Sequence, residues 1–319
     1  MNNPRDCIIV GGGAAGLSAA LVLGRARRRT LLVDAGEQSN RMAEGIGGLL
    51  GYDRRPPEAL YRAGRDELAA YPSVEVRGGH VVGAIDRGGT FDLELDDGSR
   101  ERARRVLLAT GMDYRFPEVP GVAQRWGRSV FHCPFCHGWE VRDRPLGVLD
   151  RGALAVQRAL LLRFWSDDVT LLTNGAADLG SGDLDRLQRA GVVLEERVVG
   201  ALRGPGSTLE AVAFTDGSER RCEGLLLAVT LYQRSTLATQ LGARIAEPGP
   251  VVAEAVAIDT MFRTSIPGLF AAGDVGTQSP SVATAVAAGS TAAAAVVHDL
   301  LAEAYAFGPL APPAGTPYR

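Results

Sequence analysis

The stretch Cys-Ile-Ile-Val-Gly-Gly-Gly-Ala-Ala-Gly, residues 7–16, decides the fold of this chain. Its four apolar residues predict a short buried strand, its glycines predict a tight turn, and the apolar pattern of residues 17–23 predicts a helix directly afterwards. Gly11, Gly13 and Gly16 match the pattern G-x-G-x-x-G, in which small residues let the backbone approach a pyrophosphate at the helix N-terminus. The stretch therefore predicts a strand, turn and helix that bind a dinucleotide.

The residues that follow strengthen this interpretation, because the glycine pattern alone is weak. Residues 31–33 are apolar and predict a second strand, which ends at Asp34 about 20 residues beyond the glycines, where a carboxylate would bond a ribose hydroxyl. A glycine-rich turn without a ligand is the alternative, and the combination of strand, turn, helix, strand and acid argues against it. We predict that the dinucleotide contacts Gly11, Gly13, Ala15, Gly16 and Asp34.

The chain up to residue 111 supplies further sheet structure. Pro56-Pro57 opens a segment through Leu68 that predicts a helix, and short apolar or alternating runs between residues 74 and 108 predict a small sheet with an Asp-Gly hairpin turn at 97–98. His80 lies at the end of one of these runs, and we interpret it as structural rather than catalytic. We predict that the dinucleotide is approached a second time by the backbone of Ala109, Thr110 and Gly111.

Two of the four cysteines, Cys133 and Cys136, stand at C-x-x-C spacing in the stretch His-Cys-Pro-Phe-Cys-His-Gly-Trp-Glu, residues 132–140. At this spacing two thiols can cycle with a disulfide, because one sulfur attacks as a thiolate while the other resolves the mixed disulfide. The flanking His132 and His137 can supply a base, since an imidazole titrates in the right range. The stretch therefore predicts a catalytic redox pair.

Three other interpretations of the cysteine pair compete with this one. Cys-x-x-Cys-His is also the attachment pattern of c-type haem, which requires export, and residues 1–6 do not have the composition of a signal peptide. A zinc site would need a second ligand pair, whereas Cys7, Cys222, His80 and His298 are isolated in the sequence. A purely structural pair is the third alternative. We favour the redox pair and predict no metal site.

Composition narrows the class of protein. With 46% hydrophobic and 22% charged residues, the 319-residue chain is long enough for two globular domains. All 34 basic residues are arginine, and 37 acidic residues leave a net charge of −3, which does not favour nucleic-acid binding. The longest apolar run, residues 283–297, is shorter than a membrane span requires. Four cysteines without an export signal suit a reducing compartment, so we predict a cytoplasmic protein.

The second half of the chain repeats the strand, turn and helix with altered chemistry. Residues 146–149 predict the strand, and Asp150, Gly152 and Ala155 occupy the positions of the three glycines. A carboxylate at the first position would repel a pyrophosphate. The position equivalent to the ribose-binding acid is Thr173, and neither an acid for a ribose nor an arginine for a 2′-phosphate is found there. The repeat therefore argues against nicotinamide binding and for a retained scaffold.

A third ligand-binding segment is expected near the end of the chain. Residues 266–275 predict an apolar strand that delivers Asp274, followed by an alanine-rich helix from about residue 282. In a flavin site that carboxylate would bond the ribityl hydroxyls, and the helix N-terminus would stabilise negative charge on the ring. A carboxylate that merely caps a turn is the alternative. Residues 308–319 are predicted to form a loose tail. The residues assigned to the flavin here are Gly273, Asp274, Val282 and Ala283.

Taken in order, the glycine-rich turn, the Ala-Thr-Gly at 109–111, the C-x-x-C and the Gly-Asp-Val at 273–275 resemble the low-molecular-weight thioredoxin reductases. The resemblance implies an α/β fold of two Rossmann-like three-layer nucleotide-binding domains, the second inserted in the first. It further implies a homodimer with an FAD-binding domain of residues 1–117 and 245–319. The inserted domain would be a degenerate NAD(P)H-like domain of residues 118–244 that carries the C-x-x-C.

Two departures from the reductases narrow the resemblance. His137 replaces the acid that usually follows the second cysteine, and the second dinucleotide turn is altered at Asp150. Both departures are similar to those of flavin-dependent dithiol oxidases that close disulfides in gliotoxin- and holomycin-type natural products. That resemblance implies a small-molecule dithiol that reduces the cysteine pair, a pair that reduces FAD, and oxygen that is converted to hydrogen peroxide. Two alternatives stay open: an NADPH-dependent or otherwise driven thioredoxin-disulfide reductase, and a flavin-binding module without turnover.

Overall fold

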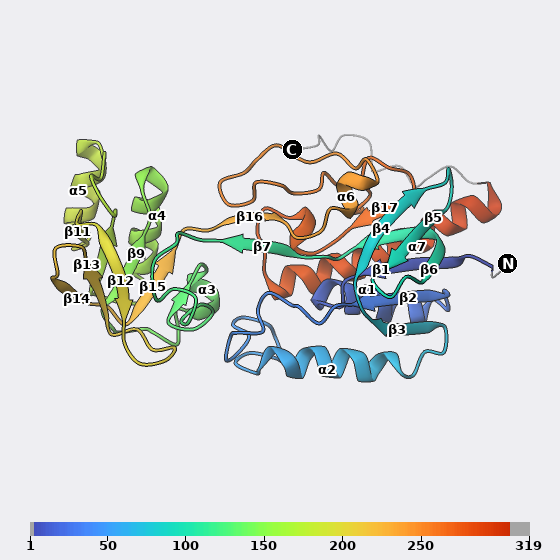
Figure 1. Cartoon of the computed structure of the whole chain (residues 1–319), viewed down its shortest axis with the longest axis horizontal. Helices are drawn as coiled ribbons and strands as arrows, with labels where there is room; N and C mark the ends of the chain where they lie inside the picture. The colour runs from blue at the N-terminus through green and yellow to red at the C-terminus, as the bar shows by residue number, and fades with distance from the viewer. Residues whose placement is uncertain (1–2, 307–319) are drawn as a thin grey trace. The chain divides into compact units, whose positions relative to one another are not determined.

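A computed structural model describes residues 3–306 and divides the chain into two compact units. Unit 1 holds the residues up to 41, residues 57–114 and the residues from 231 on, and unit 2 holds residues 42–56 and 115–230. The α/β class expected from the sequence is confirmed, since both units are built on parallel strands with helices (Figure 1). The tail predicted at 308–319 lies outside the described residues.

Unit 1 is organised around a seven-stranded mixed sheet with the order β3-β2-β1-β6-β5-β4, in which β17 also pairs with β6. Strands β3, β2, β1, β6 and β17 are parallel, and β4 and β5 run antiparallel. The predicted Asp-Gly turn joins β5 to β6. The strands span β1 Arg5–Val10, β2 Thr30–Asp34, β3 Val74–Gly78, β4 Val81–Asp86, β5 Phe91–Leu95, β6 Arg100–Leu108 and β17 Leu269–Ala271.

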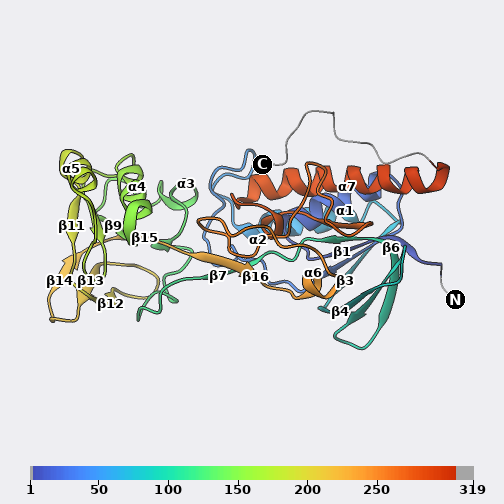
Figure 2. The same cartoon turned by 90° about the horizontal axis from the view of Figure 1, so that it is seen from above.

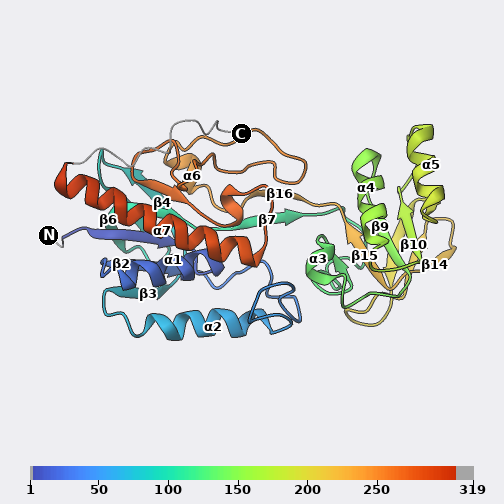
Figure 3. The ribbon, with the colours of Figure 1, turned by 180° about the vertical axis from the view of Figure 1, so that it is seen from behind.

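Three helices close the core of unit 1. They are α1 (Ala14–Arg25), α2 (Pro57–Leu68) and α7 (Val282–Tyr305), while α6 (Leu237–Gln240) is a single turn. Helices α1 and α7 contact the sheet, and α2 packs on α1. Helix α7 runs alongside α1 (Figures 2 and 3). Their approach is so close that a Cβ on Gly289 would lie 2.0 Å from the Ala15 carbonyl oxygen. The shared apolar core includes Ile9, Leu23, Leu32, Leu107 and Val296.

Helix α7 is the one helix of residues 3–306 that is long and apolar enough to cross a membrane by length and composition. Its alanine and valine face is instead packed in the core of unit 1, where Ala292, Ala293, Ala295 and Val296 are fully buried. The apolar character of the helix is therefore explained by its contacts within the unit.

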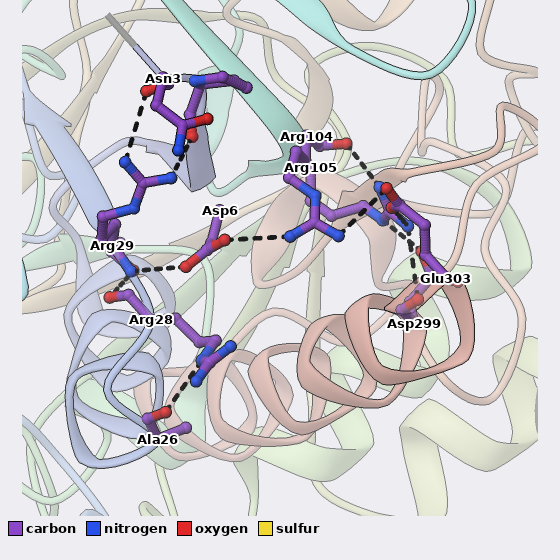
Figure 4. A network of polar contacts seen from close by, with 11 residues as sticks. Asn3, Asp6, Ala26, Arg28, Arg29, Arg104, Arg105, Asp299 and Glu303 are labelled. Atoms are coloured by element: carbon purple, nitrogen blue, oxygen red, sulfur yellow. Dashed lines mark hydrogen bonds and ion pairs between the residues drawn. The ribbon is translucent and has the colours of Figure 1, made fainter. Parts of the chain in front are cut away.

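A polar network ties the C-terminal half of α7 to the sheet (Figure 4). The buried guanidinium of Arg105, on β6, binds the Asp299 carboxylate and donates to Glu303 Oε2 at 2.7 Å. The neighbouring Arg104 donates to Asp6 Oδ1 at 3.2 Å, and Asp6 Oδ2 accepts the backbone N–H of Arg29 at 2.9 Å. Each buried charge in the network has partners of opposite charge, and these ion pairs fix the C-terminal half of α7 against the sheet.

Unit 2 repeats the parallel arrangement on a smaller scale. Its five-stranded sheet has the order β11-β10-β9-β15-β8, and a separate antiparallel sheet has the order β12-β13-β14. Helices α4 (Gly152–Leu162) and α5 (Ser181–Arg189) accompany them, and α3 (Pro134–His137) is one short turn. The strands span β8 Val130–Phe131, β9 Leu146–Leu149, β10 Val169–Leu172, β11 Val193–Glu195, β12 Val199–Arg203, β13 Ala211–Phe214, β14 Glu219–Arg221 and β15 Gly224–Leu227.

The chain leaves unit 1 through β7 (Met112–Arg115) and returns through β16 (Thr230–Gln233), and these two strands pair (Figure 1). The crossings therefore fall at 114/115 and 230/231, whereas the sequence placed the boundaries at 117/118 and 244/245. The return is earlier because Leu231 is already buried and donates to the Val251 carbonyl at 2.8 Å. The grouping of residues 42–56 with unit 2 had no counterpart in the sequence analysis.

Candidate functional site

The glycine-rich turn of unit 1 forms a backbone cradle between β1 and α1. Gly11 has φ +110°, and a Cβ there would lie 2.2 Å from the Ala109 carbonyl oxygen. A Cβ on Gly16 would lie 1.8 Å from the Gly11 carbonyl oxygen, so the start of the helix touches the turn. Beside Gly13 the nearest atom would be 3.8 Å away, on Gln38, and no side chain caps the helix there. The turn is packed from behind and open in front, which fits a pyrophosphate.

Asp34 lies at the end of β2, as the sequence predicted, and its carboxylate is held by neighbours. Oδ1 accepts from the Gly36 N–H at 2.8 Å and from Gln38 Nε2 at 3.0 Å, and Arg65 Nη1 lies 3.7 Å from Oδ2. A Cβ on Gly12 would lie 2.2 Å from Asp34 Cγ, so this position also requires glycine. Sequence reasoning missed Gln38 and Arg65, which no motif marks.

The second predicted approach to the dinucleotide lies where β6 ends beside β1. The Ala109 N–H donates to the Val10 carbonyl at 2.8 Å, which places the backbone of Ala109 behind Gly11. Gly111 has φ +68° and no heavy atom within 4 Å of the position a Cβ would take. The contacts of Ala109, Thr110 and Gly111 with a ligand stay a prediction.

Asp274 opens the short turn η1 (Asp274–Gly276) that follows β17. The preceding Gly273 has φ +84°, and a Cβ there would lie 2.9 Å from that of Ala15, so this turn and the start of α1 are in contact. The part-buried Asp274 accepts a hydrogen bond on Oδ2 from the Tyr114 hydroxyl at 3.0 Å, and burial raises the pKa of this carboxyl. The turn therefore presents a carboxylate with one oxygen already engaged.

The first turn of α7 includes the predicted Val282 and Ala283. It is capped by Ser281, whose hydroxyl accepts the Thr284 N–H at 3.1 Å, in a reciprocal capping box. Together the glycine cradle, the acid at the end of β2 and the part-buried Asp274 fit a flavin dinucleotide. We predict that FAD would be held by these residues of unit 1.

The cysteine pair belongs to unit 2, at the start of α3. Cys133 and Cys136 form a disulfide with Cα atoms 5.4 Å apart, and Cys133 is the N-cap of the short helix. Phe135, between them, is 71% exposed and meets the Trp165 ring edge-on at a centroid distance of 5.5 Å. A Cβ on Gly47 would lie 2.4 Å from the Cys136 carbonyl oxygen, so the 42–56 segment covers the backbone of the second cysteine.

Both flanking histidines are enclosed by aromatic rings. The His132 ring stacks on Trp126 at 5.8 Å, and burial, helped by the neighbouring His137, lowers its pKa to about 4. The His137 ring stacks on Phe131 at 5.7 Å with Nε2 3.1 Å from the Gly127 carbonyl oxygen, and burial lowers its pKa as well. At neutral pH both imidazoles are therefore uncharged.

At the second dinucleotide turn, the charged side chains contact other groups of unit 2. Asp150 forms an ion pair with Arg158 of α4, so its charge is offset and simple repulsion, which the sequence suggested, is not the main obstacle. An arginine does reach the end of β10: Arg151 comes from the turn itself and donates to the backbone carbonyls of Thr173 and Asn174. Both arginines at this turn thus have hydrogen-bond partners within unit 2.

The remaining candidates lie apart from this chemistry. Cys7 and Cys222 are free and buried, and burial raises the pKa of both thiols, that of Cys222 to about 12, so they are unreactive. His80, in unit 1, lies 3.8 Å from Glu37 in an exposed pair. Among residues 3–306 no group of three His, Cys, Asp or Glu side chains is arranged to hold a metal ion.

Comparison with known proteins identifies relatives over nearly the whole chain. A family model described as pyridine nucleotide-disulphide oxidoreductase matches residues 5–290. The chain is 31% identical over 316 residues to the thioredoxin reductase tcpT of Claviceps purpurea, which covers 95% of this chain and 96% of the relative.

Two solved structures share the fold at higher identity. An oxidoreductase from Agrobacterium tumefaciens has a TM-score of 0.88 and 37% identity, covering 94% of this chain and 99% of that one. HlmI has a TM-score of 0.89 and 36% identity, covering 96% of this chain and 95% of that one. These matches confirm the resemblance to thioredoxin reductases and their gliotoxin- and holomycin-type relatives that the motifs indicated.

Proposed function

Because the chain belongs to the pyridine nucleotide-disulphide oxidoreductase family, we propose that it is a thioredoxin reductase-like oxidoreductase working as an FAD-dependent dithiol oxidase. Its substrate would be a small-molecule dithiol of the natural-product kind, in which it forms an intramolecular disulfide while oxygen is reduced to hydrogen peroxide.

One observation carries the proposal: the charged side chains of the second dinucleotide turn are engaged with one another and with the backbone of unit 2. Arg151 donates to two backbone carbonyls at the end of β10, and Asp150 is paired with Arg158. A reductase that draws electrons from NADPH needs that turn open. Because these side chains are engaged within unit 2, the turn supports electrons that enter from a thiol substrate at the Cys133–Cys136 disulfide.

The residues around the disulfide suit thiol oxidation. A substrate thiol loses its proton to the neutral His132 or His137 and attacks one sulfur of the pair, which breaks the disulfide and releases the other cysteine as a thiolate. The second substrate thiol then attacks the mixed disulfide, so the substrate leaves as a disulfide and both cysteines are left reduced with two protons gained. FAD bound in unit 1 would accept the two electrons that restore the pair and pass them to oxygen.

The side chains beside the pair indicate the substrate's character. Phe135 and Trp139 are 71% and 56% exposed, and the Arg142 guanidinium lies 3.9 Å from the centre of the Trp139 ring. Exposed aromatic rings offer flat apolar contact to a small ring-containing molecule. They support a small dithiol over a charged protein surface as the reactant.

The experiment that tests the proposal compares two electron donors under anaerobic conditions. We expect a small dithiol such as dithiothreitol to bleach the bound flavin and air to restore its colour with one peroxide per dithiol, while micromolar NADPH leaves the flavin oxidised. Cys133→Ser and Cys136→Ser should abolish dithiol bleaching. Rapid bleaching by NADPH would instead establish the reductase direction, and a flavin that responds to neither donor would leave a binding module.

The family resemblance also supports a homodimer acting in the cytoplasm, without nucleic-acid or membrane partners. Sedimentation equilibrium of the holoprotein tests the homodimer, because a dimer gives twice the molar mass of the chain.

A further inference from the structure

A chain of hydrogen bonds in unit 1 ends at Asp274 and has no counterpart in the motifs. The Tyr114 hydroxyl donates to Asp274 Oδ2 at 3.0 Å, and the Ser39 side chain is hydrogen-bonded to the same phenol. A phenol has a single proton, which here goes to the carboxylate, so Ser39 donates to the phenolic oxygen. These hydrogen bonds join three segments that are far apart in the sequence: the loop after β2, strand β7 and the turn η1.

The protonation states of this chain are fixed by its surroundings. Burial and the neighbouring carboxylate of Asp274 both raise the pKa of Tyr114, so the phenol keeps its proton and remains a donor at neutral pH. Asp274 is part-buried and has one oxygen, Oδ2, committed to that donor. The other oxygen, Oδ1, is the acceptor left for a ligand.

The same turn is held by the second crossing strand. Gln233, the last residue of β16, donates from Nε2 to the Val275 carbonyl at 3.3 Å, one residue beyond Asp274. Arg234 then binds the other crossing strand, donating to Asp113 Oδ1 at 3.0 Å and to the Met112 carbonyl at 3.1 Å. Both crossing strands are thus bonded to the turn that carries Asp274, β7 through Tyr114 and β16 through Gln233.

We propose that Tyr114 is a positioning residue for the flavin: it orients the Asp274 carboxylate so that Oδ1 accepts hydrogen bonds from the ribityl hydroxyls. Ser39 orients the phenol in turn, which links the loop after the ribose-binding Asp34 to the ribityl carboxylate. The inference rests on the proposed binding of FAD and is independent of the direction in which electrons flow.

The test is the affinity of flavin-free protein for FAD, measured by quenching of flavin fluorescence. Tyr114→Phe removes only the hydroxyl, and we expect about tenfold weaker binding, because a hydrogen bond to a charged group is lost. Tyr61→Phe is the matched control: its buried hydroxyl donates to Asn40 Oδ1 at 2.6 Å in the same unit and not to the Asp274 carboxylate. The control should bind FAD within about twofold of the wild type, since its partner is a neutral amide.

A double-mutant cycle separates positioning from general support of the fold. If Tyr114 acts through Asp274, then Tyr114→Phe should change affinity by less than about twofold in an Asp274→Asn background. Ser39→Ala, which leaves phenol and carboxylate in place, should weaken binding by about threefold and serves if Tyr114→Phe does not fold.

Two outcomes overturn the inference. The first is an affinity for FAD that Tyr114→Phe leaves unchanged. The second is a double variant in which the two losses of affinity multiply independently. Either would show that the hydroxyl does not act through the carboxylate. A wild-type protein that binds no FAD would remove the proposed function and this inference together. Normal FAD affinity with no dithiol turnover would remove only the proposed function.

Discussion

The two dinucleotide turns of this chain start from the same strand, turn and helix and end in different chemistry. In unit 1, Gly16 lets α1 touch the turn, and a Cβ there would lie 1.8 Å from the Gly11 carbonyl oxygen. In unit 2 the equivalent residue is Ala155, fully buried with its Cβ accommodated, and Asp150 replaces the first glycine. The difference teaches that a strand, turn and helix can be kept while the backbone and the contacts of the turn change, since the positive φ falls on Gly11 in unit 1 and on Gly152 in unit 2.

The largest effect is expected from a substitution at the third glycine of the unit 1 turn. Gly16→Ala places a Cβ inside the van der Waals radius of a backbone oxygen, and we expect a loss of about 3 kcal/mol in the free energy of unfolding together with loss of flavin. The reverse change, Ala155→Gly, should cost about 1 kcal/mol, through helix propensity, and leave flavin content unchanged. Urea unfolding and the flavin absorbance of purified protein measure both. Equal losses from the two changes would contradict the distinction between the turns.

A pH titration sharpens the comparison, because both histidines with lowered pKa lie in unit 2. The folded pKa of His132, about 4, is below its unfolded value of about 6.5, so the unfolded state binds the proton first as pH falls. Stability is therefore full above about pH 6.5 and falls towards pH 4, by at most about 3 kcal/mol for this residue.

Replacing His132 tests this dependence. His132→Gln should flatten the change in unfolding free energy between pH 7 and pH 4.5, whereas His298→Gln, at an exposed position on α7, should keep the wild-type change. Urea unfolding at the two pH values gives the difference for each protein. A wild-type-like slope in His132→Gln would show that another group carries the acid sensitivity.

The smallest of these effects concerns the acid of the second turn. Asp150→Ala leaves Arg158 without its partner, and we expect a loss of about 2 kcal/mol in the free energy of unfolding, with FAD affinity unchanged. Adding Arg158→Met should recover most of the loss, because an apolar side chain replaces the unpaired charge. Thermal unfolding of the two variants checks this, and a fall in FAD affinity would refute the structural role of Asp150.

The sequence predicted the parts of the site that depend on neighbouring residues. The cradle of Gly11, Gly13 and Gly16 and the strand that ends at Asp34 could be predicted because each element is local and its period is plain. The contact of Tyr114 with Asp274 could not, since it joins β7 to a turn 160 residues later that no motif connects.

The second turn shows the same limit. The sequence placed a carboxylate at Asp150 and correctly marked the turn as altered, but its partner, Arg158, lies eight residues along α4 and only the fold brings the two together. The role of Arg151 at the end of β10 could not be predicted, because this side chain reaches the strand end from the turn, 22 residues earlier in the sequence. Long-range charge pairing is what a single sequence does not reveal.

The 42–56 segment has a consequence for how this protein can be recombined. Met42 packs beside Gly127, Glu44 pairs with Arg128 at 3.1 Å, and Gly47 lies against Cys136, although residues 42–56 are encoded far from the rest of unit 2. A chimera that exchanges residues 115–230 alone would pack the cysteine loop of another protein against the 42–56 segment of this one. Transplanting the thiol chemistry as a module therefore means moving two pieces of gene together.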